Sequence, residues 1–445
     1  MNTYLSQVLQ AVEKRDPSEP LFLQAVKEVI ESLDPIIAEH PEIEEEAILE
    51  RLCEPERQII FRIAWQNDKG QTQVNRGFRI GFNSSLGPYK GGLRFHPTVN
   101  LDTIKFLGFE QIFKNSLTNL PIGGGKGGSD FNPKGKSECE VMRFCQAFMS
   151  ELFRYVGFQT DVPAGDIGVG GREIGFLFGQ YKKLTQRFEP GVITGKDVGL
   201  GGSLARKEAT GFGVVYFAKA MLQTRKTDLS GKTCLVSGSG NVAIYCIKKL
   251  QDMGAKVVAC SDSSGSIHDP EGIDLDVVRL LKESEKARIS EYIYRRPRAT
   301  FRAKQTVWDI PCEMASPCAT QNELNEKDAK TLLKNGCILI AEGANMPSTP
   351  DAIKVFQQKK ILFGPAKASN AGGVAVSALE MQQNASLEQW TFQMVDQRLQ
   401  GIMNTIHGSC LHYSEKYHRK DDNIFGANVA GFLRVAQAVH AYGVI

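Results

Sequence analysis

Three lysines in the first third of the chain could do chemistry on an anionic substrate. Lys90 lies in GPYKGG, Lys114 follows Gln111 by three residues on a predicted helix, and Lys126 lies in GGGKGG. Ammonium groups that converge in a cleft repel and desolvate one another, which lowers the pKa of at least one towards neutrality. We therefore expect Lys126 to exchange protons, and the other two lysines to neutralise carboxylates. The alternative for each lysine is a solvated surface charge, and we adopt it for Lys105.

Two aspartates in the segment DVPAGD form a second candidate group. Asp161 and Asp166 lie in a predicted loop that proline and glycine constrain, and aspartates are common turn formers. Beside a lysine cluster, however, one of them would be held ionised and could carry protons. Asp166 is flanked by glycine, and we favour it for that role.

A glycine-rich element predicts a dinucleotide site. Gly238, Ser239, Gly240, Asn241, Val242 and Ala243 form a G-x-G-x-x-A motif between the predicted strand Thr233–Ser237 and the predicted helix Asn241–Met253. Gly238 would permit the tight turn, and Gly240 would let a pyrophosphate approach the helix N-terminus. The alternative is an ordinary strand–helix turn, which the spacing of strand, motif and helix disfavours. We expect a nicotinamide dinucleotide that exchanges hydride with the substrate.

The choice between NAD and NADP rests on the end of the next predicted strand, Lys256–Cys260. Asp262 follows it, about twenty residues after the motif, where an acidic residue ordinarily binds the ribose 2′-hydroxyl of NAD. Serines flank Asp262, however, and three basic residues on the next predicted helix could neutralise a 2′-phosphate: Lys282, Lys286 and Arg288. A solvated helix face is the alternative for these three.

The first half of the chain must position the lysines. Residues 1–56 predict two or three amphipathic helices, with apolar residues at helical spacing over Leu21–Leu33. A β-hairpin should follow from Gln58, with its turn at Asn67–Gly70. The pattern then predicts a helix over Asp102–Leu117 with Asp102 as N-cap, a glycine loop over 123–128, and a helix over 138–155.

The second half predicts a doubly wound sheet. A helix over Ala209–Leu222 is followed by alternating strand and helix patterns to about residue 365, which is typical of a parallel sheet covered on both faces. A turn-rich stretch near residue 200 separates the halves and is the expected hinge of a cleft. The fold class is therefore α/β with two domains: an α/β substrate and oligomerisation domain, and a Rossmann-like dinucleotide-binding domain.

Composition excludes several classes of protein. The net charge is +3, and no Lys/Arg run or basic–aromatic stripe suggests nucleic-acid binding. The ten cysteines include no C-x-x-C pair and no metal-like cluster, so we expect reduced thiols, no metal and a cytoplasmic location. Neither a signal peptide nor a membrane span is expected.

Several motifs along the chain resemble the hexameric glutamate dehydrogenase family: GPYKGGLRFHPTVN, KFLGFEQIFKNSLTNLPIGGGKGGSDF, DVPAGDIGVGGREIG, GGSLARKEATGFG, VSGSGNVA, PCATQNEL, AEGANMPSTP and ASNAGGVAVSALEMQQN. The resemblance covers nearly the whole chain, in the family's motif order. It implies reversible reductive amination of 2-oxoglutarate with ammonia and NAD(P)H to L-glutamate, by a homohexamer.

The resemblance also implies roles for residues of the substrate site. Lys126 would polarise the 2-oxo group and activate water or ammonia, and Asp166 would relay protons. Lys90 and Ser377 would bind the side-chain carboxylate, Lys114 with Gln111 the 1-carboxylate, and Gly165 would line the site. Relatives that act on leucine, phenylalanine or valine need no cation at the side-chain end, so Lys90 with Ser377 favours glutamate.

The cofactor residues follow from the same resemblance. Thr210 and Asn345 would approach the nicotinamide, and Asn241 the pyrophosphate, with Gln321 also at the cofactor. VSGSGNVA with SDSSG resembles the NADP-dependent branch, where Ser263 and Lys282 would meet the 2′-phosphate, helped by Lys136 and Arg206; NAD is the alternative.

The sequence departs from the family at three places: Lys207 stands where proline is usual, Phe212 replaces a common tyrosine, and residues 292–307 are unusually basic. We expect residues 1–199 to bind substrate and subunits, residues 200–421 to bind the dinucleotide, and a helix within 422–445 to return to the first domain. The rival interpretations are a dehydrogenase for apolar amino acids and a catalytically silent NADP-binding protein.

Overall fold

The computed structural model describes residues 2–444 and divides into two compact units. Unit 1 holds the chain up to residue 204 together with 376–395 and the chain from 428 onwards, and unit 2 holds 205–375 and 396–427. This division differs from the boundaries expected at 199 and 421, because residues 376–395 pack with unit 1 although they come late in the chain. No helix among residues 2–444 has the length and apolar character of a membrane span.

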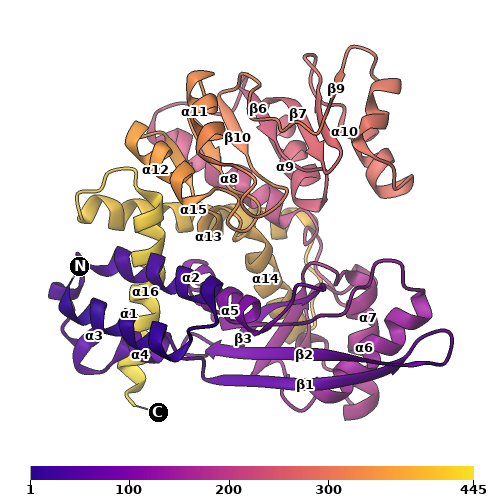
Figure 1. Cartoon of the computed structure of the whole chain (residues 1–445), viewed down its shortest axis with the longest axis vertical. Helices are drawn as coiled ribbons and strands as arrows, with labels where there is room; N and C mark the ends of the chain where they lie inside the picture. Colours follow the sequence, from indigo (N-terminus) through magenta and orange to yellow (C-terminus); the bar gives the residue numbers. More distant parts are fainter. Residues whose placement is uncertain (1, 445) are drawn as a thin grey trace. The chain divides into compact units, whose positions relative to one another are not determined.

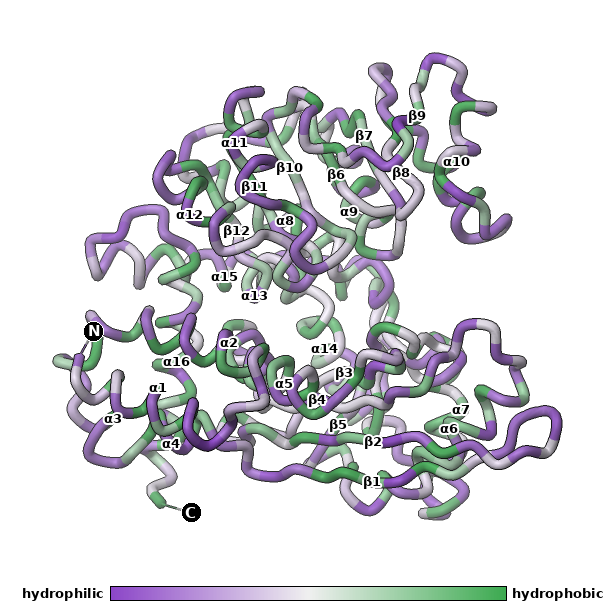
Figure 2. The backbone as a smooth tube through the Cα atoms, in the orientation of Figure 1, coloured by the Kyte–Doolittle hydropathy of each residue, from purple (hydrophilic) through white to green (hydrophobic). Residues whose placement is uncertain are grey.

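Unit 1 is built on a five-stranded mixed sheet with the order β1-β2-β4-β3-β5 (Figure 1). The strands are β1 (Arg57–Gln66), β2 (Thr72–Asn83), β3 (Tyr89–Phe95), β4 (Gly123–Ser129) and β5 (Asp161–Gly165). β1, β2 and β4 pair antiparallel, whereas β3 runs parallel to β4 and β5. The predicted hairpin is confirmed, and its tip is hydrophilic in Figure 2.

The glycine run expected as a loop is instead the buried strand β4. A Cβ at Gly124 would lie 2.8 Å from the backbone of Ile112 in helix α5 (Leu101–Leu117), and one at Gly128 would lie 2.2 Å from the carbonyl of Arg94. Only glycine lets the helix and the neighbouring strand approach so closely. Strand pairing with β2 and β3 therefore overrides a composition that is unusual for a strand.

Helices cover both faces of this sheet. On one face, α6 (Glu138–Leu152) and α7 (Gly171–Thr185) share a core with β1 and β3 that includes Trp65, Phe95 and Phe144. On the other face, α5 packs with α2 (Pro20–Leu33) and with α16 (Asn423–Tyr442), whose Gly431 carbonyl accepts a hydrogen bond from Ser116. The predicted helices over 21–33, 102–117 and 138–155 are thus confirmed within three residues at each end.

Two side chains of α5 differ from their predicted roles. Asn100, not Asp102, caps the helix by accepting from the Thr103 amide at 2.9 Å. Asp102 accepts instead from the Phe22 amide at 2.9 Å, at the start of α2. The prediction that Lys105 is a surface charge is wrong. Lys105 is 2% exposed and ion-paired with Asp16 at 2.6 Å, because α2 packs against this face of α5.

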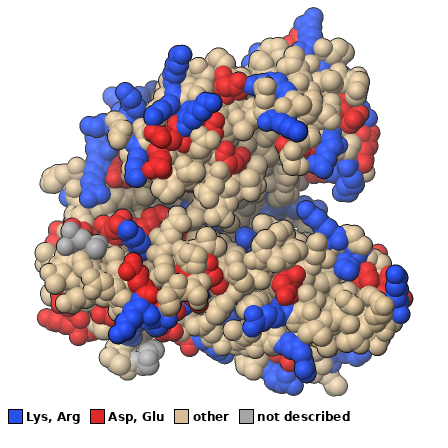
Figure 3. All heavy atoms as spheres, viewed as in Figure 1, with Lys and Arg blue, Asp and Glu red and all other residues tan. Residues whose placement is uncertain are grey.

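Short elements complete unit 1. The predicted amphipathic helices of residues 1–56 are confirmed, and acidic side chains gather there in Figure 3. Besides α2, the helices of this region are α1 (Thr3–Arg15), η1 (Ile37–Glu39), α3 (Glu42–Glu45) and α4 (Ile48–Leu52). Two one-turn helices lie later in unit 1, η2 (Pro190–Val192) and η3 (Val198–Leu200).

Unit 2 contains a seven-stranded sheet with the order β12-β11-β10-β6-β7-β8-β9. Its strands are β6 (Thr233–Val236), β7 (Lys256–Asp262), β8 (Gly265–His268), β9 (Thr300–Ala303), β10 (Met314–Ser316), β11 (Leu339–Ala341) and β12 (Leu362–Gly364). The strands from β12 to β7 are parallel, and β8 and β9 add antiparallel pairs at one edge. The chain enters at β6, adds β7 on one side and β10 on the other. This is the doubly wound order that was predicted, with its switch point beside β6.

The helices of unit 2 are α8 (Ala209–Thr224), α9 (Asn241–Asp252), α10 (Leu275–Arg279), η4 (Leu280–Ser284), η5 (Ile289–Tyr294), α11 (Glu326–Lys334), α12 (Pro350–Lys359) and α13 (Ala366–Ser369). Two more, α14 (Gly372–Ser386) and α15 (Phe392–Lys416), have residues in both units, as does α16. One expected helix is shorter than predicted: Lys282 lies in η4, but Lys286 has φ 54° and Arg288 is extended.

The unusually basic segment 292–307 finds acidic partners within unit 2. Arg296 lies 3.2 Å from the buried Asp269, and Arg295 lies 2.7 Å from Glu285. Arg302 is paired with Asp309. Local ion pairs therefore account for much of this segment's charge.

Candidate functional site

The predicted dinucleotide element has the expected strand–turn–helix geometry. Gly238 follows β6 with φ 87°, and a Cβ there would lie 3.2 Å from Ala319, so the turn requires glycine. Gly240 is the N-cap of α9, and a Cβ there would meet nothing within 4 Å. Open space in front of unpaired helix amides suits a phosphate. Ser239 is buried, Val242 is half-buried, and Asn241 donates to the Lys207 carbonyl at 2.7 Å.

The strand end after β7 gathers the residues expected at the ribose. Both carboxylate oxygens of Asp262 are engaged, one by Ser264 and the other by Lys282 at 3.1 Å and the Ile289 amide at 3.0 Å. Burial alone would raise the pKa of Asp262, but these hydrogen bonds lower it to about 2. The exposed Ser263 accepts from Arg288 at 2.7 Å. An occupied carboxylate beside an exposed hydroxyl and guanidinium suits a phosphate better than a free ribose hydroxyl.

The remaining predicted cofactor residues lie at separate places. In unit 2, Thr210 lies in the first turn of α8, where its hydroxyl would be 2.5 Å from a Cβ at Gly373, and Asn345 accepts from Asn370 at 3.1 Å. Arg206 is half-buried just before α8, and Gln321 is exposed in a turn after β10. Lys136 belongs to unit 1, where its Nζ lies 5.7 Å from the centre of the Trp65 ring.

In unit 1, the structure joins Lys126 to Asp166. Lys126 lies in the middle of β4, and Asp166 directly follows the end of β5. The Lys126 amine donates to Asp166 Oδ2 at 2.7 Å. Arg94 of β3, which the sequence did not single out, donates to the same oxygen at 3.0 Å. Leu93 and Phe95 face the core under α6 and α7, so alternation directs Arg94 and Lys90 to the α5 face.

The charges of this cluster shift both partners. Burial lowers the pKa of the Lys126 amine, and the carboxylate of Asp166 offsets that effect only in part. Burial alone would raise the pKa of Asp166, but the neighbouring charges of Lys126 and Arg94 lower it far below its usual range. The arrangement therefore holds an ionised carboxylate against an amine that loses its proton more easily than a free lysine.

Lys90 and Ser377 are joined through a third residue. Lys90 is 1% exposed, and its Nζ donates to Thr194 Oγ1 at 2.8 Å and to the Val162 carbonyl at 3.1 Å. The Thr194 hydroxyl in turn lies 2.6 Å from that of Ser377 on α14. Sequence reasoning missed Thr194, because a threonine in a turn-rich stretch carries no signal of its own. The result is a buried cation beside two hydroxyl groups.

The helix α5 carries the other two predicted substrate residues. Gln111 and Lys114 are half-buried one turn apart, and Gln111 donates to Asn115 at 2.5 Å. Asn115 is buried and donates to the Lys90 carbonyl at 3.0 Å, which ties the helix to β3. Gly165 is half-buried at the end of β5, where the Val169 carbonyl leaves no room for a Cβ.

The two aspartates of DVPAGD have different environments. Asp161 lies beneath the sheet and forms a bidentate ion pair with the fully buried Arg79 of β2. Arg79 also donates to the Gly91 carbonyl at 3.0 Å, passing Gly125 and Gly127 of β4. Its guanidinium thus crosses two glycine-rich strands to reach β5. Asp161 is structural, and Asp166 alone faces Lys126.

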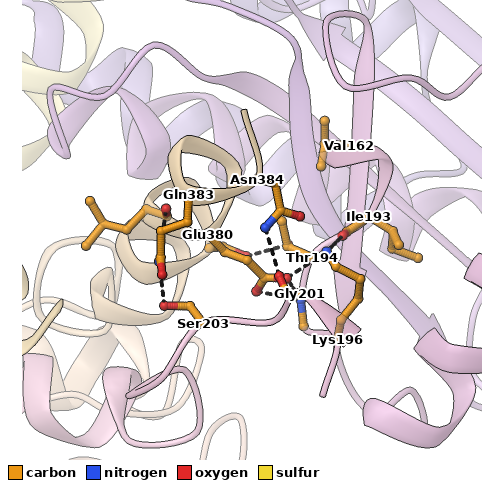
Figure 4. A network of polar contacts seen from close by, with 12 residues as sticks. Val162, Ile193, Thr194, Lys196, Gly201, Ser203, Glu380, Gln383 and Asn384 are labelled. Atoms are coloured by element: carbon orange, nitrogen blue, oxygen red, sulfur yellow. Dashed lines mark hydrogen bonds and ion pairs between the residues drawn. The ribbon is translucent and has the colours of Figure 1, made fainter. Parts of the chain in front are cut away.

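A buried polar network around Lys196 and Glu380 connects α14, which carries Ser377, to residues 193–203 (Figure 4). Lys196 lies 2.9 Å from Glu380 on α14, and neither side chain is exposed. Burial lowers the pKa of Lys196, and the Glu380 carboxylate offsets this in part. The Gly195 amide also donates to Glu380, at 3.0 Å. No sequence pattern singles out either of these two charges.

Comparison with known proteins agrees with this architecture. Residues 201–443 match the family model described as Glutamate/Leucine/Phenylalanine/Valine dehydrogenase, and residues 55–183 match its dimerisation domain. The chain is 56% identical to a protein of Helicobacter pylori strain 26695 named NADP-specific glutamate dehydrogenase, over 99% of this chain and 100% of that protein. It is 50% identical to a Bacteroides fragilis protein named NAD-specific glutamate dehydrogenase, over 99% and 100%.

Among solved structures, that of Plasmodium falciparum glutamate dehydrogenase is similar to this chain, with a TM-score of 0.97 and 52% identity over 99% of this chain and 95% of that one. Sequence and structure agree across both units. The chain therefore belongs to the Glu/Leu/Phe/Val dehydrogenase family.

Proposed function

We propose that this chain catalyses the reversible, NADPH-dependent reductive amination of 2-oxoglutarate with ammonia to L-glutamate. Relatives named glutamate dehydrogenase, at 50% to 56% identity over the full chain, support this function. One observation carries the choice of substrate: unit 1 holds two cationic positions on one face of its sheet, Lys126 beside Asp166 and Lys90 beside Thr194 and Ser377. A 2-oxo dicarboxylate needs a site for the distal carboxylate besides the reacting centre, and the second position supplies it.

The proton chemistry is assigned to Lys126 and Asp166. The ammonium form of Lys126 donates to the 2-oxo oxygen and stabilises the negative charge that develops there. Asp166, held ionised, accepts a proton as ammonia attacks and returns one as water leaves. The 2.7 Å separation of the two groups allows direct proton transfer between them. Lys114 and Gln111 are assigned to the 1-carboxylate, with Gly165 lining the site.

The residues of unit 2 fit NADP. The open backbone at Gly240 and the N-terminus of α9 would hold the pyrophosphate, and Ser263 with Lys282 and Arg288 would hold the 2′-phosphate. Bound NADPH supplies the hydride for reduction. Thr210 and Asn345 are assigned to its nicotinamide end, with Gln321 and Arg206 as further contacts within unit 2.

Use of NAD in place of NADP is the second candidate. Relatives named NAD-specific and NAD(P)-specific glutamate dehydrogenase support it. The structure weighs against it, because the carboxylate of Asp262 already accepts hydrogen bonds from Lys282, Ser264 and the Ile289 amide. A ribose 2′-hydroxyl would have to compete with these partners.

The assignment of the units follows from the sites. Unit 1 is proposed to bind the substrate and, since residues 55–183 match a dimerisation domain, to form the contacts of a homohexamer. Unit 2 is proposed to bind the dinucleotide. All ten cysteines are free thiols, which suits a reducing, cytoplasmic location.

The deciding experiment measures initial rates of NADPH oxidation, and then of NADH oxidation, with 2-oxoglutarate and ammonium. Rapid turnover with NADPH and little with NADH is expected. A preference for NADH would keep the substrate and overturn the cofactor assignment. No turnover with either, but activity on apolar 2-oxo acids, would overturn the role of Lys90 and Ser377. Binding of NADPH without any turnover would indicate a silent binding protein.

A further inference from the structure

The ion pair between Lys196 and Glu380 is fully buried and lies close to the proposed carboxylate site. Its two charged atoms are 2.9 Å apart, and neither side chain is exposed. Removing two charges from water costs free energy that their attraction does not reliably recover, so a buried pair is weak evidence for stability. A role in fixing the geometry around it is the alternative explanation.

The pair gathers one turn of chain around the carboxylate of Glu380. The Gly195 amide donates to both oxygens, at 3.2 and 3.0 Å, and the Lys196 amine also donates to the Ile193 carbonyl. Thr194 lies inside this turn, between residues that are all held by the same two side chains. Its hydroxyl therefore has little freedom to move.

The helix α14 contributes the opposite half of the same arrangement. Ser377 precedes Glu380 by three residues, so both side chains project from one face of the helix. Further along, Gln383 donates to Ser203 at 2.8 Å and Asn384 donates to the Gly201 carbonyl at 2.8 Å (Figure 4). Contacts at successive turns of α14 thus fix its position along residues 193–203. The ion pair between Lys196 and Glu380 is the charged contact among them.

We propose that Lys196 and Glu380 are positioning residues that determine specificity for a dicarboxylic 2-oxo acid. They hold the hydroxyls of Thr194 and Ser377 at 2.6 Å from each other and beside the Lys90 amine, where the distal carboxylate binds. A substrate of equal chain length that ends in a methyl group makes no use of this alignment. Loss of the pair therefore weakens binding of the dicarboxylate selectively. This inference rests on the proposed function.

The test uses the full-length enzyme with Glu380→Gln, Lys196→Met and the double variant. The double variant removes both charges, while the amide oxygen at 380 still accepts from Gly195, so it keeps the fold testable if a single variant unfolds. The KM for 2-oxoglutarate should rise by about tenfold to 100-fold, with kcat and the KM for NADPH much less affected. The ratio of kcat/KM for 2-oxoglutarate to that for 2-oxopentanoate should fall by a similar factor.

Lys105→Met is the matched control, because Lys105 is a buried lysine of unit 1 paired with Asp16 and Glu19 away from this network. It should lower the melting temperature without changing the specificity ratio. A double variant of Lys196 and Glu380 that retains the unmodified ratio would overturn this inference and leave the proposed function intact. An unmodified enzyme without activity on 2-oxoglutarate would overturn both.

Discussion

At the scale of single residues, the amine of Lys126 is the group on which the proposed chemistry depends. Replacing Lys126 with alanine should reduce kcat by at least about 10⁴-fold, because it removes both a proton donor and the charge that stabilises the developing oxyanion. NADPH binding should be nearly intact, since the proposed dinucleotide residues Gly238–Val242 belong to unit 2. Single-turnover kinetics and fluorescence titration with NADPH measure the two effects. The exposed Lys134→Ala serves as control, and turnover preserved in Lys126→Ala would contradict the assigned role.

The pH dependence gives a second prediction for the same pair. In reductive amination Lys126 acts in its ammonium form, so kcat/KM falls as the pH rises through its pKa, and burial places this fall below the usual range of lysine. The negative charge of Asp166 raises that pKa, so Asp166→Asn should lower it further. The basic limb of the profile should therefore move to lower pH, and the plateau should be at least about 100-fold lower because the proton relay is lost. A limb that moves to higher pH would show that Lys126 is not the titrating group.

At the scale of secondary-structure elements, β5 depends on the pair formed by Arg79 and Asp161. β5 is the last strand of its sheet and pairs with β3; Asp161 begins it, and Asp166 follows its end. Asp161→Asn would leave a fully buried guanidinium without its counter-charge, which typically costs about 3–5 kcal/mol. Urea denaturation should show this loss of the free energy of unfolding. Glu31→Gln, which removes an exposed ion pair with Lys27, should change it by less than about 1 kcal/mol.

These elements show what the sequence could and could not predict. Local patterns predicted the hairpin of β1 and β2, the helix α5 and the β6–α9 unit, because each depends on periodicity and turn residues close in the chain. The strand β4 was predicted as a loop, since its seven glycine-rich residues become a strand only when β2 and β3 pair with it. Arg79 meets Asp161 across 82 residues, and Thr194 meets Ser377 across 183. Separations of this size leave no pattern in the sequence, so Arg79, Arg94, Thr194 and Lys105 were missed or misassigned.

At the scale of the whole molecule, the two units should respond to different ligands. A ligand stabilises the region that binds it by RT ln(1 + [L]/Kd), about 2.7 kcal/mol at a concentration of 100 Kd. Hydrogen exchange of the intact protein should therefore slow most strongly around Gly238–Val242 and Asp262–Ser263 when NADPH is added. Saturating 2-oxoglutarate should instead protect β3, β5 and residues 193–203 of unit 1. Glutarate, which lacks the 2-oxo group, is the matched ligand for testing whether the distal carboxylate alone protects residues 193–203.

The same experiment separates cofactor choice from substrate choice, because NADPH and NADH differ only at the 2′-phosphate. NADPH should protect residues 261–264 and 287–289 more than NADH does, since Arg288 and Ser263 meet the phosphate while the carboxylate of Asp262 is already occupied. Equal protection by the two dinucleotides would mean that these groups do not read the phosphate. Protection of unit 1 alone by either dinucleotide would contradict the division of labour between the units. In an Arg288→Ala variant, NADPH and NADH can be compared in the same way. If the two dinucleotides then protect residues 261–264 and 287–289 equally, and protection elsewhere is unchanged, the Arg288 side chain is what distinguishes NADPH from NADH.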